Sequence, residues 1–411
     1  MTPTSQKKTK FLLITASILQ EPLACLQSLL PILIIKQLNA GIIHISFLTS
    51  LLPTVAIISF YWGSLLHRTQ SLYCIRHNLV SATLLAALLF LFTPWMNNPW
   101  FFVLAGSCYF LFFRAANPAR IEIFKKFFKE NTREALYSKI FKTIYGISII
   151  LAPVFGKTID TNPKLWRILF FLSALLYMLS ALCYQLIPIQ GKKPTPTKPK
   201  QSALHTLIEP WLTSYAILKK NPLFSWFQLG FFITGFGLML AKPATELLLG
   251  NLPISYYSLF IGRLLFKGIG VIGSAKVWSR HLNAASVLSL ASLVAYGFMS
   301  YTLLVMATSS SSFFIFPAYL LYGITQSGSH LIWNLSGALL SGNESSCQYS
   351  SVNILSVGIR GSIAPAIGGL CIGTIGMIPA LSCGTIFMLF GAYYLSKKHK
   401  DINTIQQVIS A

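Results

Sequence analysis

The sequence predicts an all-α membrane protein with twelve transmembrane helices in two pseudo-symmetric bundles of six. Three observations support this fold class. Of the 411 residues 54% are hydrophobic and only 10% are charged, whereas a soluble chain of this length needs more polar surface. Apolar runs long enough to cross a bilayer recur along the chain. One segment of the first half also returns in the second half.

A helix needs about 20 apolar residues to cross the hydrocarbon of a bilayer. The first run resembles a signal peptide, but it continues to Ile35 without a small-residue cleavage site, so we expect an uncleaved span. The runs predict an N-terminal bundle over 1–188, a linker over 189–221 and a C-terminal bundle over 222–411. They lie at about 11–36, 41–65, 77–95, 100–120, 138–160, 165–188, 222–248, 253–275, 283–306, 313–340, 351–372 and 377–396.

The repeated segment is Tyr137–Gly156, which aligns without a gap with Tyr349–Gly368, 212 residues further on. A spacing of about half the chain indicates two equivalent halves, a construction common in membrane transporters. The small residues of the second copy share one helical face, against which another helix could approach closely and slide. We assign a conformational role to the glycines and prolines of both copies, namely Gly146, Pro153, Gly156, Gly358, Pro365 and Gly368.

The chain has 32 basic and nine acidic residues, a net charge of +23. Such a balance can indicate nucleic acid, but here the basic residues form short runs between apolar stretches, which fits anionic lipid better. One alternating set of loops holds 23 Lys and Arg and the other holds four. This asymmetry predicts that both termini are cytoplasmic. We expect a monomer in the cytoplasmic (inner) membrane that binds no nucleic acid.

Two stretches next to predicted spans are amphipathic. In the linker, 191–201 is rich in Pro and Lys and should be extended, whereas Ser202–Lys220 places Ile208, Trp211 and Tyr215 on one helical face. Arg120–Leu136 does the same with its three Phe residues. Both stretches are predicted to be helices lying on the inner membrane surface.

Charged side chains inside a span cost about 2.5–3.5 kcal/mol each on insertion scales, so they usually face a cavity and are functional. Lys242 and Glu246 are four residues apart and are expected to neutralise each other. Arg114, Arg263 and Arg360 have only Glu21 as an intramembrane acid. The unmatched Arg residues therefore need carbonyl dipoles, water or an anion from outside the chain. We predict an anionic substrate, an organic phosphate or a carboxylate. The alternative is that some of these Arg side chains reach the interface.

Polar residues extend this candidate binding set. Gln326, His330 and Asn334 recur every fourth residue beside Trp333, a pattern that suits the wall of a small-ligand pocket. Asn117 can share a helical face with Arg114, and Asn353 can share one with Arg360. The alternative role for each is hydrogen bonding between helices.

Glu21 is the candidate for coupling to protons, because the protonation of a carboxyl in the membrane depends on burial and on nearby charge. Binding of an anion to a neighbouring Arg would change that charge. His330 could share the role, although a single His on a polar stripe more often only donates and accepts hydrogen bonds.

With twelve spans, repeated halves and a basic central loop, the chain resembles the major facilitator superfamily, and the resemblance covers nearly all of it. The family signature between spans two and three is Gly-x-Leu-x-Asp-Arg-x-Gly-Arg. Here that stretch is 63–71, in which Gly63, Leu65 and Arg68 match and His67 replaces the acid. The resemblance implies alternating access between the halves, with Gly63 and Arg68 in a conformational latch. Loss of the acid weakens the case for that latch.

The resemblance leaves the direction of transport open. Antiporters of the family carry Gly-Pro-x-x-Gly-Gly on span five, of which this chain keeps only a looser form at 152–157. Either a symporter or an antiporter is compatible with the sequence.

Other function classes receive less support. No Walker-type Gly-Lys-Ser/Thr sequence is present, and the Ser, His and seven Cys residues form no constellation expected of an enzyme or a metal site, so we expect no enzyme and no cofactor. The alternatives kept are an efflux carrier for drugs or metabolites with a hydrophobic pocket, and a transporter-like receptor that no longer transports.

Overall fold

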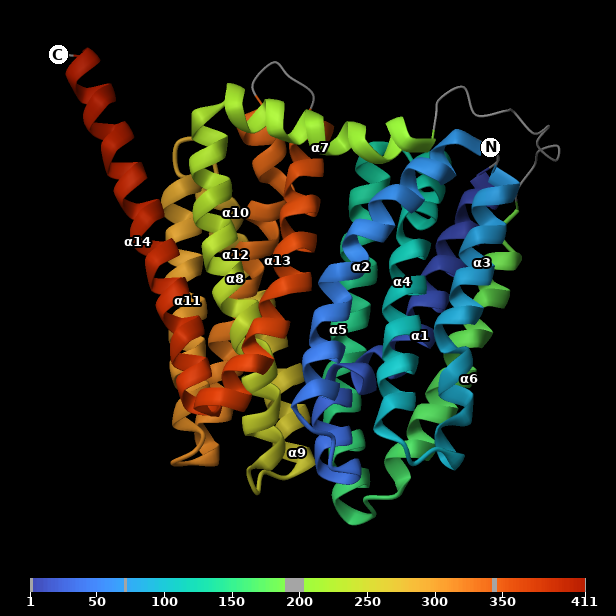
Figure 1. Ribbon diagram of the computed structural model, residues 1–411. Helices are drawn as coiled ribbons and strands as arrows, with labels where there is room; N and C mark the ends of the chain where they lie inside the picture. Colours follow the sequence, from blue (N-terminus) through green and yellow to red (C-terminus); the bar gives the residue numbers. More distant parts are fainter. Residues whose placement is uncertain (1–2, 70–71, 189–202, 342–345, 411) are drawn as a thin grey trace. The chain divides into compact units, whose positions relative to one another are not determined.

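The structure is a computed structural model that describes residues 3–69, 72–188, 203–341 and 346–410 (Figure 1). Over these residues every regular element is helical. The first half contains α1 (Pro3–Leu38), α2 (Ile42–Thr69), α3 (Leu72–Leu88), the 3-10 helix η1 (Leu89–Trp95), α4 (Pro99–Phe127), α5 (Glu130–Thr161) and α6 (Leu165–Gln185).

The second half begins with α7 (Ala203–Lys220), which occupies most of the predicted linker helix. Its other elements are α8 (Pro222–Asn251), α9 (Tyr256–Phe260), η2 (Ile261–Phe266), α10 (Lys267–His281), α11 (Val287–Ala307), η3 (Ser312–Phe314), α12 (Ile315–Leu340), α13 (Ser346–Ile375) and α14 (Met377–Ser410). The predicted span at 253–275 is thus a continuous run of α9, η2 and α10, in which η2 is a π-helical turn.

Ten helices of the described residues are long and apolar enough to cross a membrane, so the predicted helical membrane fold is confirmed. Two predicted spans, 41–65 and 313–340, are helical but are not among the ten. α2 contributes a shorter apolar helix, Ile42–Ile58. α12 has 26 residues, enough to span, but its polar residues lower its hydropathy.

The chain forms two compact units. Unit 1 comprises 1–44, 55–200 and 255–264, and unit 2 comprises 45–54, 201–254 and 265–411. Each unit therefore contains a short segment from the other half of the sequence, the start of α2 or the start of the α9–α10 span. Within α2 the division into units changes after His44 and again after Thr54, one residue beyond Pro53. In the α9–α10 span it changes after Leu264, within η2.

In unit 1, α1 packs against α5 and α6, and α3 packs against α4 and α6. The core of this unit includes Phe124, Phe127 and Phe128. The prediction of one surface helix over Arg120–Leu136 was wrong: α4 ends at Phe127 and α5 begins at Glu130. These three Phe residues face the core of the unit, where burying them contributes more than an interfacial position would.

In unit 2, α8 packs against α11, α13 and α14, and α12 packs against α10, α11 and α13. α7 runs crosswise to α8 (Figure 1). It buries Ile217 and exposes Trp211, Leu212 and Tyr215. The stretch is helical over Ala203–Lys220, and its amphipathic role at the membrane surface stays a prediction.

The first turn of α9 is capped from α5. Asp160 accepts hydrogen bonds from the backbone N–H groups of Tyr256 and Tyr257, each at 2.8 Å, while Ser255 caps Ser258. Gly156 makes the approach possible, since a Cβ there would overlap the backbone of Tyr257. Three of the four N–H groups that a helix start leaves unpaired thus have acceptors.

The other predicted small-residue contacts differ among themselves. A Cβ at Gly368 of α13 would overlap the carbonyl of Leu240 in α8, which confirms a close approach there. At Gly146 a Cβ would meet nothing within 4 Å. Pro153 and Pro365 lie inside α5 and α13. The side chains of Gly63–Ser71 fall outside the described residues.

Candidate functional site

Glu21 of α1 is held between α1 and α5. Its Oε1 accepts hydrogen bonds from the Ser148 hydroxyl and, at 3.3 Å, from the Cys25 thiol. Ser148 and Cys25 are buried, and Glu21 itself is partly buried. The contacts of Glu21 thus include two neutral donors, one on α1 and one on α5.

The neighbouring side chain, Gln20, connects three helices. It donates to Ser180 of α6 at 2.9 Å and accepts from Arg120 of α4 at 3.1 Å. The Arg120 guanidinium also lies 6.0 Å from the centre of the Tyr184 ring. The sequence placed Arg120 at the start of the predicted surface helix Arg120–Leu136, whereas in the structure it lies within α4 and is partly buried.

Arg114 and Asn117 lie on α4, both partly buried. The Nε of Arg114 is buried and has no hydrogen-bond acceptor among the described residues. Arg114 thus lies within α4, 15 residues after the start of the helix, and not in a loop.

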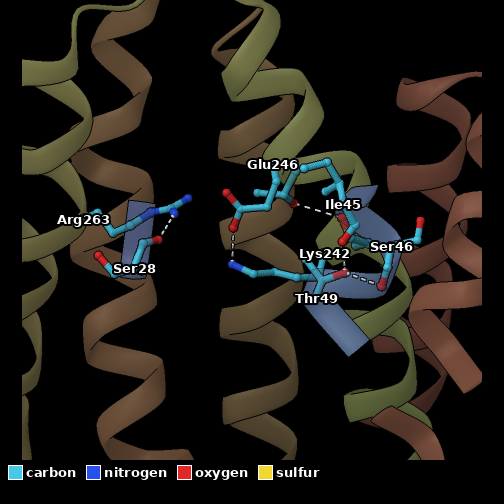
Figure 2. Close-up of polar contacts among 9 residues, drawn as sticks. Ser28, Ile45, Ser46, Thr49, Lys242, Glu246 and Arg263 are labelled. Atoms are coloured by element: carbon cyan, nitrogen blue, oxygen red, sulfur yellow. Dashed lines mark hydrogen bonds and ion pairs between the residues drawn. The ribbon is translucent and has the colours of Figure 1, made fainter. Parts of the chain in front are cut away.

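Arg263 lies in the π-helical turn η2 and is 5% exposed. Its Nη1 donates to the backbone carbonyl of Ser28 in α1 at 2.5 Å (Figure 2). Such π-turns are rare and often mark functional positions. The positive charge of Arg263 is therefore partly stabilised by a backbone carbonyl dipole. Carbonyl dipoles were one of the three partners that the sequence analysis named for an Arg without a carboxylate.

Arg360 of α13 lies against α8 in unit 2 and is also 5% exposed. Its Nη1 donates to the Phe231 carbonyl at 2.5 Å, and its guanidinium carbon lies 4.9 Å from the centre of the Phe231 ring. Its Nε is buried without an acceptor among the described residues. No carboxylate of the described residues forms an ion pair with Arg360. At this burial the side chain is enclosed by the helices of unit 2.

Lys242 and Glu246 form the predicted pair on α8. The Lys242 Nζ lies 2.6 Å from the Glu246 Oε1 (Figure 2). Glu246 is 1% exposed and Lys242 is 40% exposed. The pair neutralises itself across one helical turn, so the prediction is confirmed.

The polar stripe of α12 is only partly buried. His330 and Asn334 are exposed, and Gln326 and Trp333 are partly buried. The indole Nε1 of Trp333 has no partner among the described residues.

Asn353 of α13 is instead buried within helix packing. It accepts a hydrogen bond from Gln228 of α8 and donates to the Trp333 carbonyl and to Ser336, each at 3.0 Å. Through these bonds the Asn353 amide joins α8, α12 and α13. Hydrogen bonding between helices is the alternative role that the sequence analysis gave for Asn353.

Sequence reasoning passed over several residues of these sites. Ser148 and Phe231 carry no charge, so the count of intramembrane charges does not include them. Gln27 of α1 could have been found as a polar residue in the first span; it is 4% exposed and neither atom of its amide has a partner among the described residues. The described residues contain no group of three or more potential metal ligands among His, Cys, Asp and Glu.

The fold and these sites define a helical, multi-pass membrane protein with polar and charged groups buried inside each unit. The family model of the Major Facilitator Superfamily matches residues 12–365. The chain belongs to this superfamily, and it is therefore a membrane transporter by family. The resemblance found in the sequence is confirmed.

Solved structures share the fold at low sequence identity. A mutant of the nucleoside transporter NupG has a TM-score of 0.66 at 13% identity over 96% of this chain and 99% of its own. A POT family transporter in complex with 5-aminolevulinic acid also has a TM-score of 0.66 at 13% identity. The match covers 98% of this chain and 96% of the POT family chain. A bacterial homolog of the human lysosomal transporter Spinster has a TM-score of 0.61 at 13% identity, and the match covers 96% of each chain. No curated protein matches the chain.

Proposed function

We propose that the chain is a secondary active transporter that moves a small anionic metabolite, an organic phosphate or a carboxylate, across the cytoplasmic membrane by alternating access. The observation that carries this proposal is Arg360, a guanidinium 95% buried in unit 2 without a carboxylate partner among the described residues.

The contacts that Arg360 does have are neutral. A carbonyl dipole and the face of a Phe ring stabilise a cation, the ring by about 2 kcal/mol or more when water is excluded. Neither supplies a negative charge. Arg pairs well with carboxylate or phosphate through two parallel hydrogen bonds. An anionic substrate would therefore complete the electrostatics of this site.

Arg114 supports the same proposal from unit 1, since its Nε also has no acceptor among the described residues. Asn117, three residues along α4, can present its amide on the same face. In unit 2 the stripe of Gln326, His330 and Asn334 would add donors and acceptors, and Trp333 an aromatic wall. We assign Arg263 and Asn353 to holding helices together, because both bond to other helices.

We further propose that Glu21 couples transport to protons.

The structural relatives do not select a substrate: their titles name nucleosides for one and 5-aminolevulinic acid for another. At 13% identity such likeness supports the fold alone, so the anion proposal depends on the Arg residues.

Transport by purified protein in proteoliposomes tests the proposal. The substrates would be glycerol 3-phosphate, phosphoenolpyruvate, citrate, neutral uridine and a hydrophobic dye. We expect counterflow of at least one anion. Arg360→Gln should lower its initial rate at least about 100-fold, because two charge-assisted hydrogen bonds are lost. Arg360→Lys should retain part of the rate, since it keeps the charge and loses the planar fork.

Arg280→Gln is the matched control, because Arg280 is exposed at the end of α10. Counterflow of uridine or the dye without any anion would favour the efflux alternative. An Arg360→Gln protein that exchanges every anion at the wild-type rate would reject the proposal.

A further inference from the structure

Arg360 is held by two residues of α8, Phe231 and Gly235, which we call the Arg360 cradle. They are four residues apart, so they lie one above the other on the same face of α8. α13, which carries Arg360, packs against α8. The cradle is therefore made by a helix that packs directly against the Arg helix.

Each member of the cradle restricts the guanidinium in a different way. The Phe231 carbonyl accepts from Nη1, and its second lone pair remains for the helical N–H of Gly235. The Phe231 ring lies 4.9 Å from the guanidinium carbon. At Gly235 a Cβ would overlap Cζ, Nη1 and Nε of Arg360, so α8 lies against one face of the guanidinium there. Any larger side chain there would push the guanidinium out of its present position.

These contacts use one edge and one face of the guanidinium. The Nε–H lies on the opposite side from Nη1 and has no acceptor among the described residues. Nε and Nη2 form the side-on edge of an Arg, whose two N–H groups match two oxygens of a carboxylate or phosphate. A buried N–H without an acceptor is unfavourable, and a substrate oxygen would supply the missing acceptor.

We propose that Gly235 and Phe231 are positioning residues for substrate recognition: they fix the orientation of the Arg360 guanidinium so that its Nε edge receives the oxygens of the substrate. This inference rests on the proposed function and specifies which edge of Arg360 recognises the anion.

Gly235→Ala tests the positioning role through kinetics. The added methyl group should raise the half-saturation concentration of the anion identified above about tenfold or more, the effect of one lost charge-assisted hydrogen bond, with little change in maximal rate. In an Arg360→Lys background the same substitution should have little further effect, because Lys has no planar group above Gly235. Equal effects in both backgrounds would overturn the role.

Two glycine controls separate positioning from packing damage. A Cβ at Gly273 of α10 would meet nothing within 4 Å, so Gly273→Ala should be silent. A Cβ at Gly237 of α8 would overlap the carbonyl of Gly384 in α14, so Gly237→Ala should reduce thermal stability. If Gly237→Ala raised the half-saturation concentration as much as Gly235→Ala does, the effect of Gly235→Ala would be general damage to α8.

A second measurement does not require a transported substrate. In nanodiscs containing ¹⁵N-arginine-labelled full-length protein, the Arg360 Nε–H resonance can be assigned by its loss in Arg360→Lys. We expect it to shift in Gly235→Ala, to remain in place in Gly273→Ala, and to shift on addition of inorganic phosphate or acetate.

The outcomes are distinguishable. An unchanged resonance in Gly235→Ala would reject the cradle, and an unchanged resonance with both oxyanions would reject the assignment of the edge. If the wild-type protein exchanges no anion, the proposed function fails, and the effect of Gly235→Ala on the resonance still decides whether the cradle orients Arg360.

Discussion

At the scale of single residues, the surroundings of Glu21 suit a group that gains and loses a proton. The Ser148 hydroxyl donates to the carboxylate and also lies 3.1 Å from the carbonyl of Ile144. When Glu21 is protonated, the hydroxyl can turn its proton to that carbonyl and accept a hydrogen bond from Glu21. Ser148 can therefore serve as a partner for both protonation states without movement of a helix.

Glu21→Gln is expected to separate exchange from accumulation. Gln keeps the size and the hydrogen bonding of Glu but cannot release a proton, so uptake driven by a pH gradient should be lost. Counterflow, which needs no net proton movement, should continue. Both are measured in the same proteoliposomes with the anion identified above.

Cys25→Ser is the control, since it keeps a donor beside Glu21 and should retain both activities. Full gradient-driven uptake by Glu21→Gln, with the wild-type dependence on pH, would exclude Glu21 as the coupling group.

At the scale of secondary-structure elements, α9 depends on a carboxylate that its own sequence neighbourhood does not contain. Asp160 lies 96 residues before Tyr256 and accepts from two N–H groups of the first turn. The helix start also carries a partial positive charge, which favours an anionic side chain there. Phe155 and Phe260 add a ring contact between α5 and α9, with centroids 6.0 Å apart.

Asp160→Ala should loosen the start of α9. Loss of a capping side chain costs about 0.5–2 kcal/mol, which corresponds to roughly 2- to 30-fold faster local opening. Hydrogen–deuterium exchange followed by mass spectrometry should show faster exchange in a peptide covering 255–264.

Asp401→Asn offers a comparison, because Asp401 pairs with Lys398 within α14. It should leave the exchange of 255–264 unchanged. Wild-type exchange of that peptide in Asp160→Ala would show that the cap contributes nothing to the stability of α9.

At the scale of the whole molecule, the distribution of positive charge predicts the orientation in the membrane. The loops assigned to the inner side hold 23 Lys and Arg, against four in the loops assigned to the outer side. Anionic lipid and the positive-inside rule both favour the basic side at the cytoplasm.

Cysteine labelling should report this orientation. In a background without native Cys, Lys164→Cys should react with a membrane-impermeant maleimide in intact cells. Lys398→Cys should react only in inverted vesicles. The reverse pattern would place the termini outside and contradict the charge rule.

Most of the helices could be predicted from the sequence, because the length and hydropathy of a span are local properties. The exceptions arise from tertiary packing. The Phe residues of Arg120–Leu136 mimic an interfacial face, but in the structure they fill the core of unit 1. The π-turn at Arg263 and the division of two spans between units have no signal in hydropathy.

From the amino-acid sequence alone it follows that the chain is a polytopic membrane protein with repeated halves, and that its predicted spans contain more positive than negative side chains. Hydropathy and charge counts suffice for that, because the bilayer acts on each segment separately. The partners of these charges, by contrast, follow from the fold. Arg263 meets a carbonyl 235 residues away, and Arg360 lies in a cradle with its Nε unpaired among the described residues. Such pairings depend on which helices pack together, and no local pattern encodes that choice.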